Sequence, residues 1–338
     1  MTSELFSLLL RPMLYSAKGD ATMTPANRCS FHRMFALLTF LTLASVIPVK
    51  ATQNINTELL SKSVVYLYRG DSNGNVDLGL PLGTGFMVRV PLASEPGKTY
   101  VVLVTARHVV DPAWNHCPDS QPQTIYLRFN KKKYDPDKDK SGVDFAQISL
   151  VENGVPTWSH PKEDDADVAV ILLNAQKVIE SEDWGAIPVS DFATDEEAKQ
   201  RVTSDPVLSV GMLVYYIGSK RNYPIFKFGY ISTKPEEPVP ARCVKDGAEN
   251  PLRLWLLSIN LIPGTSGSPI FYEPEGANGM NFGGGRTTLI GLQSTAFPGA
   301  DVSGMTPVCY IFEAIEALKL ADADLYRGIL QTKPAKTN

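Results

Sequence analysis

The chain has 338 residues, of which 43% are hydrophobic and 20% are charged, with a formal net charge of −4. This composition is typical of globular proteins and excludes a collagen-like, a wholly disordered or a multi-span membrane chain. The 25 glycines and 25 prolines favour many short strands joined by turns over a few long helices.

The N-terminal region contains the apolar run FALLTFLTLASVI at 35–47, with Arg28 and Arg33 shortly before it and with Val49 and Ala51 at the positions that a signal peptidase inspects. This pattern is typical of a signal peptide. We predict that residues 1–51 are a signal peptide with an extended first part, cleaved before Thr52, and that the product is secreted or periplasmic. The alternative is an uncleaved membrane anchor, but the run is shorter than the roughly 20 residues that a helix needs to span a bilayer.

Cleavage there removes five basic and two acidic residues from the 32 and 36 of the whole chain, which leaves a net charge of −7. Because no basic face is evident, nucleic-acid binding is not expected. No stable membrane insertion is expected after signal cleavage either. The loop at 135–139 alternates Asp as calcium ligands do, but Lys140 stands where an EF-hand needs glycine. We therefore predict no metal site and no other cofactor.

The first half of the remaining chain holds six short runs of β-forming residues, separated by polar stretches with Gly, Pro, Asp and Asn. They lie at 63–69, 84–90, 99–105, 124–129, 144–150 and 167–173. The long helical segments that a βαβ arrangement would place between strands are absent from this pattern. The first half is therefore expected to be antiparallel.

The second half repeats the pattern, with runs at 209–218, 226–233, 252–259, 268–272, 287–296 and 306–312. Two successive six-stranded antiparallel units predict an all-β fold of two packed barrels, because closure removes exposed sheet edges. We place the first barrel at about 57–185 and the second at about 205–315. Apolar residues at helical spacing predict a C-terminal helix at about 312–331.

The motif PGTSGSP at 263–269 places Ser266 between two glycines in a tight turn before an apolar strand. A nucleophile needs such exposure, and the N–H groups of Gly264 and Ser266 can converge on the oxyanion of a tetrahedral intermediate. Glycine suits this place because close approach of the backbone to a substrate tolerates no Cβ. The alternative is a plain hairpin of Gly and Ser residues.

A serine hydroxyl needs a general base within hydrogen-bond reach. The histidines after the predicted cleavage site are His108, His116 and His160. His108 follows the apolar strand TYVVLVT, which would present it at a surface cleft. The other two lie in proline-containing loops and are expected to be solvated. We therefore predict that His108 is the base, with a structural histidine as the alternative.

The base in turn needs a buried carboxylate that fixes its tautomer. Asp167 immediately precedes the apolar strand VAVILL, whereas Asp164 and Asp165 stay in the preceding polar loop. We therefore predict a catalytic triad of His108, Asp167 and Ser266. For Asp167 alone, an Asp that merely opens a strand is the alternative.

In this chain order the three residues resemble those of the trypsin-like serine peptidases, which have the chymotrypsin fold. Five motifs carry the resemblance over residues 57–320: GTGFMV at 83–88, TARHVVD at 105–111, ADVAVILL at 166–173, GTSGSP at 264–269 and IGLQS at 290–294. The motifs are most similar to those of bacterial exported members of the family. A PDZ domain at the C-terminus is not expected, because the segment after about residue 331 is too short for one. The resemblance implies a peptidase domain at 57–330 that hydrolyses polypeptide substrates through an acyl-enzyme.

The resemblance also implies how a substrate binds. Ser294, Thr295 and Ala296 would form an edge strand that pairs with the substrate backbone. Asn260, six residues before Ser266, would lie at the base of the primary specificity pocket. A neutral base of the pocket favours small or apolar substrate residues, because an unpaired buried charge is costly. Gln293 and Ser294 replace the histidine of glutamate-specific members, so acidic specificity is not expected.

Two other functions fit these residues less well than a peptidase. A non-catalytic binding protein on the same scaffold is disfavoured because all three triad residues are present. An esterase of the α/β-hydrolase type would need its serine before the Asp and His in chain order. Cys117, Cys243 and Cys309 follow the predicted cleavage site, so at most one intramolecular disulfide can form, and the sequence leaves its pairing open.

Overall fold

The computed structural model describes residues 56–318, apart from 72, 93–96, 174–180, 245, 260–261, 263, 275–285 and 298. The predicted signal peptide at 1–51 and Asn260, the predicted specificity residue, therefore lie outside the described residues. Within the described part, no helix is both long enough and apolar enough to cross a membrane.

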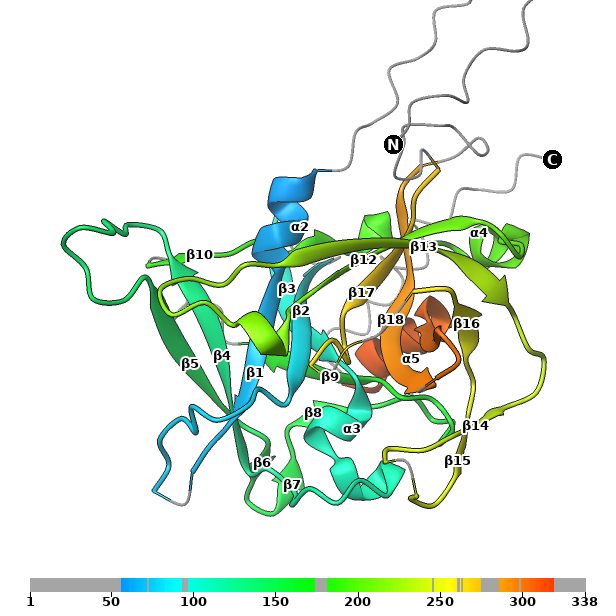
Figure 1. Cartoon of the computed structure of the whole chain (residues 1–338), viewed down its shortest axis with the longest axis horizontal. Coiled ribbons are helices and arrows are strands. Elements are labelled where there is room, and N and C mark those ends of the chain that lie inside the picture. Colours follow the sequence, from blue (N-terminus) through cyan, green and yellow to red (C-terminus); the bar gives the residue numbers. More distant parts are fainter. Residues whose placement is uncertain are drawn as a thin grey trace, which may run out of the picture. The chain divides into compact units, whose positions relative to one another are not determined.

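The first unit is one sheet in the order β10-β4-β1-β2-β3-β9-β8, with β5 on the outer side of β4 and β11 beside β2 (Figure 1). All of its strand pairs are antiparallel except β11 with β2. The strands are β1 (Val64–Arg69), β2 (Gly83–Pro91), β3 (Thr99–Thr105), β4 (Thr124–Lys131), β5 (Val143–Ser149), β8 (Trp158–Ser159), β9 (Ala169–Leu173), β10 (Glu182–Asp183) and β11 (Ile187–Pro188).

The prediction of a closed six-stranded first barrel is wrong for the described residues, where β5 pairs with β4 but not with β8 or β9. After β5 the chain enters a small hairpin of β6 (Val151–Glu152) and β7 (Val155–Pro156). Asn153 and Gly154 form its turn, with φ of 52° and 78°. An Asn-Gly pair is a strong signal for such a turn. The hairpin directs the chain away from β5 before it returns as β8, and this leaves a seam in the sheet.

The second unit is the closed antiparallel barrel that the sequence predicts, in the order β12-β13-β16-β19-β18-β17. Its strands are β12 (Pro206–Gly211), β13 (Ile225–Thr233), β16 (Trp255–Leu257), β17 (Pro269–Tyr272), β18 (Thr288–Phe297) and β19 (Val302–Pro307). A separate hairpin of β14 (Val239–Ala241) and β15 (Asn250–Leu252) precedes β16. The all-β fold class is confirmed, with one closed six-stranded barrel, a second antiparallel sheet and few helices in the described part.

Several element boundaries differ from the prediction. The strand expected at 209–218 ends at Gly211 and is followed by the 3-10 helix η5 (Val214–Tyr216). The strand expected at 306–312 is wrong, because β19 ends at Pro307 and helix α5 (Val308–Ala317) begins there. Proline has no N–H to continue a sheet, and its fixed φ favours a helix start.

The C-terminal helix therefore begins earlier than 312, and the predicted residues beyond 318 lie outside the described part. Helix α5 packs against β18 and β19 of the barrel, and also against β8 and β9 of the first unit (Figure 1). The Ser159 hydroxyl donates a hydrogen bond to the Ala314 carbonyl at 2.6 Å. The helix thus covers both units rather than the second alone.

Two further helices are short. Helix α2 (Thr57–Ser63), which the sequence pattern did not predict, begins where the Asn56 side chain accepts a hydrogen bond from the Leu59 N–H. Helix α4 (Asp195–Gln200) has a capping box between Thr194 and Glu197, an arrangement that satisfies two free N–H groups at a helix start. One hydrophobic core runs continuously through both units.

Candidate active site

His108 lies on a short helical turn at the end of a buried strand. β3 leads into the four-residue helix α3 (Arg107–Val110), and Ala106 occupies its N-cap. Val109 and Val110 are buried in the core, which fixes the turn. The His108 side chain keeps 17% of its surface exposed. The sequence around His108 thus anchors the backbone and leaves the ring at the surface.

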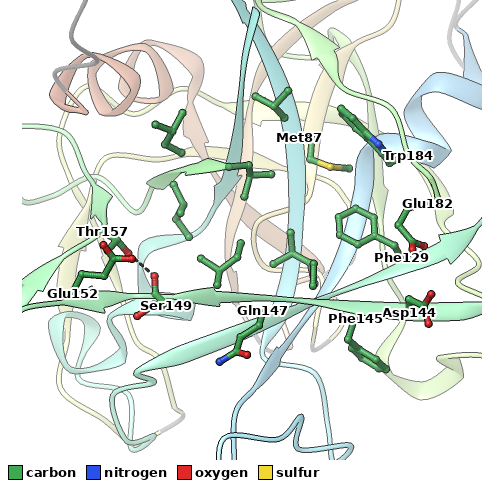
Figure 2. A pocket seen from close by; sticks show the side chains of 17 residues that line it. Met87, Phe129, Asp144, Phe145, Gln147, Ser149, Glu152, Thr157, Glu182 and Trp184 are labelled. Carbon is green, nitrogen blue, oxygen red and sulfur yellow. Dashed lines mark hydrogen bonds between the residues drawn. The ribbon is translucent and has the colours of Figure 1, made fainter. Parts of the chain in front are cut away.

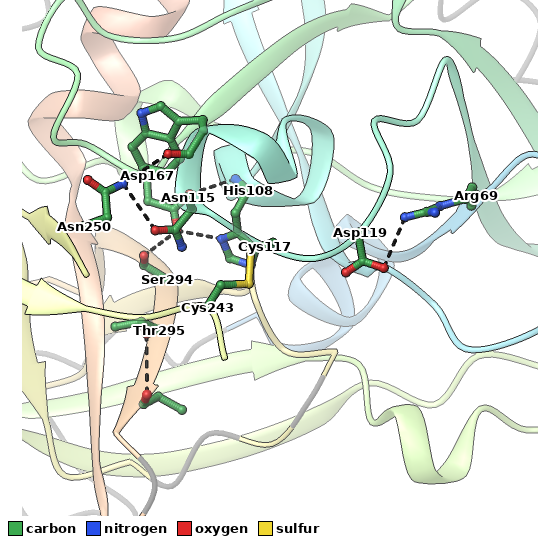
Figure 3. The surroundings of a disulfide bond; sticks show 12 residues. Arg69, His108, Asn115, Cys117, Asp119, Asp167, Cys243, Asn250, Ser294 and Thr295 are labelled. Carbon is green, nitrogen blue, oxygen red and sulfur yellow. Dashed lines mark hydrogen bonds and ion pairs between the residues drawn. A yellow bond between two sulfur atoms is a disulfide. The ribbon is translucent and has the colours of Figure 1, made fainter. Parts of the chain in front are cut away.

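Asp167 is buried, with no exposed side-chain surface, and its carboxylate receives three donors. Oδ1 accepts the His108 backbone N–H at 3.0 Å, and Oδ2 lies 2.8 Å from His108 Nδ1. The Ser294 hydroxyl donates to Oδ2 at 2.5 Å, and Figure 3 shows Asp167 between these two side chains. The distance to His108 is within the range for a general base and its orienting carboxylate.

The pair shifts the pKa of each partner. Burial alone lowers the pKa of His108, but the charge and hydrogen bond of Asp167, with a smaller effect of Asp119, raise it above its ordinary value of 6.5. Burial alone raises the pKa of Asp167, but His108 and the Ser294 hydroxyl hold it below 3.8. Asp167 is therefore ionised at neutral pH and favours a proton on Nδ1 of His108.

Ser266 lies in a turn whose backbone is held from both units. The Gly267 N–H donates to the Gln293 carbonyl at 2.7 Å. From β2, the Thr84 N–H donates to the Ser266 carbonyl at 2.9 Å, and the Thr84 hydroxyl donates to the Gly264 carbonyl at 2.7 Å. These bonds fix the carbonyl groups of the turn.

The two glycines of the turn cannot be replaced without strain. Gly264 and Gly267 have φ of 87° and 88°, a region that residues with a Cβ avoid. A Cβ at Gly264 would overlap Cγ2 of Val214, and one at Gly267 would overlap the Thr84 carbonyl oxygen. Glycine is therefore required at both of these positions of the turn.

No described residue accepts a hydrogen bond from the N–H of Gly264 or of Ser266. Both residues are partly exposed, so these two donors are available to a bound oxygen atom. Buried or half-buried N–H groups are nearly always paired. Two neighbouring unpaired donors beside a partly exposed serine are one feature that an oxyanion hole requires.

The Ser266 turn packs against the segment that carries His108. A Cβ at Gly83 would lie 2.9 Å from Cγ2 of Val109 and 3.0 Å from the Ser266 carbonyl oxygen. A Cβ at Gly267 would lie 3.0 Å from the Ala106 nitrogen. Among the described residues there is no hydrogen bond between the Ser266 hydroxyl and the His108 ring, so His108 and Asp167 are joined while Ser266 lies beside them.

The predicted substrate-binding residues have different surroundings. Ser294 is buried and contacts Asp167, so its side chain supports the carboxylate. Thr295 is half-buried and Ala296 is exposed. β17 pairs with β18 only as far as Leu292. In the described part, that edge of β18 beyond Leu292 lacks a neighbouring strand and could pair with an extended peptide.

A buried arginine next to His108 is a feature that the sequence reasoning missed. Arg107 is 8% exposed, and its Nη1 lies 2.5 Å from Asp164 Oδ1. Its Nε lies 3.3 Å from Asp111, and the guanidinium stacks 4.6 Å from the centre of the Trp114 ring. Trp114 Nε1 also donates to the Asp164 carbonyl at 3.0 Å. Arg107 therefore links the His108 turn to the loop that leads to Asp167.

The same loop is held from the second unit. Arg253 Nε donates to Asp165 Oδ2 at 2.8 Å, and the Arg253 N–H donates to the Asp165 carbonyl at 2.8 Å. The sequence carries no signal for this contact, because Arg253 lies 88 residues away in the chain and an acid at the surface needs no cationic partner. Asp164 and Asp165 thus position the backbone on either side of the loop, and Asp167 alone enters the core.

The pairing of cysteines that the sequence left open is resolved. Cys117 and Cys243 form a disulfide with their Cα atoms 5.2 Å apart, close to His108 and Ser294 in Figure 3. Cys117 follows the 3-10 helix η2 (Pro112–Asn115), which continues from the His108 turn, and Cys243 follows β14 of the second unit. Cys309 is a free thiol, and burial raises its pKa to about 11.

Replacing Cys117 and Cys243 together by alanine is expected to lower the free energy of unfolding by about 2 to 5 kcal/mol. The physical reason is that the bond closes a loop of 126 residues and restricts the unfolded chain. Urea unfolding of the oxidised protein and of the variant measures the difference. Cys309→Ala is the matched control, and equal stability of the double variant and this control would contradict the expectation.

Comparisons with known proteins give distant matches. No protein-family model matches the chain, and no curated protein matches its sequence. Among solved structures, the chain is similar to the MamO protease domain from Magnetospirillum magneticum, with 16% identity and a TM-score of 0.43 over 75% of this chain and 96% of that one. It is also similar to a Glu endopeptidase, with 13% identity and a TM-score of 0.43 over 78% and 94%.

A third similar structure is Rv3671c from M. tuberculosis, with 15% identity and a TM-score of 0.39 over 76% of this chain and 86% of that one. All three identities are low and all three TM-scores are below 0.5. The fold and the site therefore rest on the strand order and side-chain contacts of this chain itself.

Proposed function

We propose that this chain is an exported serine endopeptidase that cleaves polypeptides through an acyl-enzyme on Ser266. The observation that carries the proposal is the buried Asp167 carboxylate, which binds both the backbone and the ring of His108. Burying an ionised carboxylate is costly unless its partners are fixed. Such a pair beside a glycine-flanked serine is well suited to proton transfer and nucleophilic attack.

The proposed mechanism follows from these contacts. With Nδ1–H donated to Asp167, the other ring nitrogen of His108 is free to accept the Ser266 hydroxyl proton as Oγ attacks the scissile carbonyl. The N–H groups of Gly264 and Ser266 would stabilise the resulting oxyanion. His108 then protonates the leaving amine, and a water molecule, activated in the same way, hydrolyses the acyl-enzyme.

Substrate orientation would come from β18. Its edge at Thr295 and Ala296 is free in the described part and would add the substrate as a further antiparallel strand. The buried Ser294 cannot itself face the substrate with its side chain, which supports Asp167. The proposed primary pocket around Asn260 stays a prediction, because that residue lies outside the described part.

One experiment separates a peptidase from a binding protein on the same scaffold. The purified chain lacking residues 1–51 is incubated with a fluorophosphonate probe, and the labelled peptide is mapped by mass spectrometry. A peptide library is then profiled for cleavage. Labelling at Ser266 with cleavage supports the peptidase, with small or apolar residues expected before the cut. The absence of both labelling and cleavage would favour the binding protein.

Activity should fall on the acidic side with a midpoint above pH 6.5, since only neutral His108 can accept the proton and its pKa is raised. The pH dependence of the free energy of unfolding follows from the pKa shifts of the same two residues. The contribution of His108 is complete below 6.5 and is lost as pH rises through its folded pKa, and that of Asp167 is lost as pH falls through its folded pKa, below 3.8. A kcat/KM profile with its acidic midpoint below 6.5 would contradict the assignment.

A further inference from the structure

A cavity of about 660 Å³ opens in the first unit, between β5 and the strand pair β3 and β9. It occupies the seam that the β6 and β7 hairpin leaves in the sheet. On β5, Asp144, Ala146 and Ile148 lie opposite Phe129, Leu127 and Ile125 of β4, so the two sets share one face. That face is turned toward the cavity, since all of these residues except Ile125 line it. A volume of this size is typical of small-molecule sites.

The walls of the cavity are mostly apolar, with side chains such as Leu127, Phe129, Ile171 and Trp184. Its polar groups gather at two ends. Figure 2 shows Glu182 and Asp144 at one end and Ser149, Glu152 and Thr157 at the other. The described lining residues include three carboxylates and neither Lys, Arg nor His. An apolar cavity with an excess of negative charge selects for a cation with an apolar body.

Glu182 is the one buried carboxylate among the three described carboxylates that line the cavity. It is 6% exposed, and its Oε1 accepts the Ser181 hydroxyl at 2.7 Å. Its Oε2 is buried without a hydrogen-bond partner among the described residues. Burial raises the pKa of Glu182, and the charge and side-chain hydrogen bond of the neighbouring Asp144 add to this, whereas the Ser181 hydroxyl and the charge of Lys131 act in the opposite direction. A buried acceptor of this kind is costly to leave unpaired.

Within the described part, one cationic side chain forms an ion pair at this end of the cavity. Lys131 Nζ lies 3.1 Å from Asp144 Oδ1. Its charge also acts on Glu182, but within the described part Lys131 forms an ion pair with Asp144 and none with Glu182. A protonated amine could donate to Oε2 of Glu182 in the position that no described donor fills. Charge-assisted hydrogen bonds of this type are stronger than neutral ones.

We propose that this cavity binds an organic cation with an extended apolar body, with its ammonium group on Glu182 Oε2 and its chain on the wall formed by Leu127 and Ile171. The simplest compound of this class is a long-chain alkylammonium ion. The site is distinct from the candidate active site. In the pairing of β3 with β9, the cavity borders the Val101–Leu173 end, whereas His108 and Asp167 adjoin the Thr105–Ala169 end.

The test compares decylammonium, decanol and decanoate, which share one apolar chain and differ in charge. Isothermal titration with the chain lacking residues 1–51 is expected to show saturable binding of decylammonium, about tenfold or more tighter than decanol. Glu182→Gln keeps the shape of the side chain and should remove that preference. Glu152→Gln, at the opposite end of the cavity, is the matched control and should retain it.

A second variant places the ligand in the cavity independently of charge. Ala146→Phe puts a bulky side chain on the inward face of β5 and should abolish binding of all three compounds. Cleavage of a small peptide substrate should be unchanged in Glu182→Gln, so a failure here is distinguishable from a failure of the proposed peptidase. The proposal is overturned if decanol binds as tightly as decylammonium, if Glu182→Gln keeps the preference, or if Ala146→Phe leaves binding intact.

Discussion

Replacing Ser266 by alanine is expected to lower kcat by about a millionfold, because removing the nucleophile of a triad costs nearly as much as removing the whole triad. The residual rate would come from the two N–H donors and from substrate binding alone. Steady-state cleavage of the best peptide from the library profile measures the loss. Fluorophosphonate labelling of the same variant should be absent.

The fold should be unaffected by this change. The described contacts of Ser266 involve its carbonyl, which accepts the Thr84 N–H, and alanine preserves that bond. Ser268→Ala is a close control in the same turn, because the Ser268 hydroxyl is buried without a partner among the described residues. Removing an unpaired hydroxyl is nearly neutral. Substantial activity in Ser266→Ala, or an equal loss in Ser268→Ala, would refute the assignment of the nucleophile.

The sequence predicted the second barrel well because its strands alternate with clear turn signals and close upon themselves. It failed at Asn153 and Gly154, where a strong turn signal lay between two short strands and was overlooked. The resulting seam depends on which strands pair, and long-range pairing is not encoded in local periodicity. The strand expected at 306–312 failed for a local reason, since Pro307 both ends the sheet and starts a helix.

At the candidate site, chain order and strand context were enough to predict that His108 and Asp167 act as a pair, and the two are hydrogen-bonded. The contacts that hold them were not foreseen. Arg107 and Asp164 meet across a sequence separation of 57 residues, and Cys117 meets Cys243 across 126. Such long-range pairings form only in the folded chain, so the order of residues in a single sequence does not reveal which partners meet.

Asp167→Asn is expected to lower kcat by about four orders of magnitude at neutral pH, with the fold retained. The reason lies in the number of donors that meet at this carboxylate. Oδ1 accepts the His108 backbone N–H, and Oδ2 accepts both the His108 ring and the Ser294 hydroxyl. An asparagine side chain has one acceptor oxygen and one NH₂ group, so it cannot satisfy all three donors.

The consequence for catalysis depends on which way the amide turns. With its oxygen toward the His108 backbone N–H, the NH₂ group faces Nδ1 and requires that nitrogen to be an acceptor. The ring proton then lies on the other nitrogen, which can no longer accept the Ser266 proton. With the amide reversed, the NH₂ group meets the buried backbone N–H of His108, which leaves two donors in contact and no acceptor.

Asp165→Asn is the control that tests the choice of Asp167 within DDADV. Asp165 pairs with Arg253, whose side chain is 45% exposed, and exposed ion pairs contribute about 0 to 1 kcal/mol. Activity of this variant should therefore stay within about threefold of the parent. A larger loss in Asp165→Asn than in Asp167→Asn would show that the loop position, rather than the buried carboxylate, governs His108. If Asp167 holds the imidazole directly, the loss of activity should be larger in Asp167→Asn than in Asp165→Asn. The acidic limb of the pH profile should then be displaced only in Asp167→Asn, because Asp165 acts on the backbone and leaves the charge of the His108 ring unchanged.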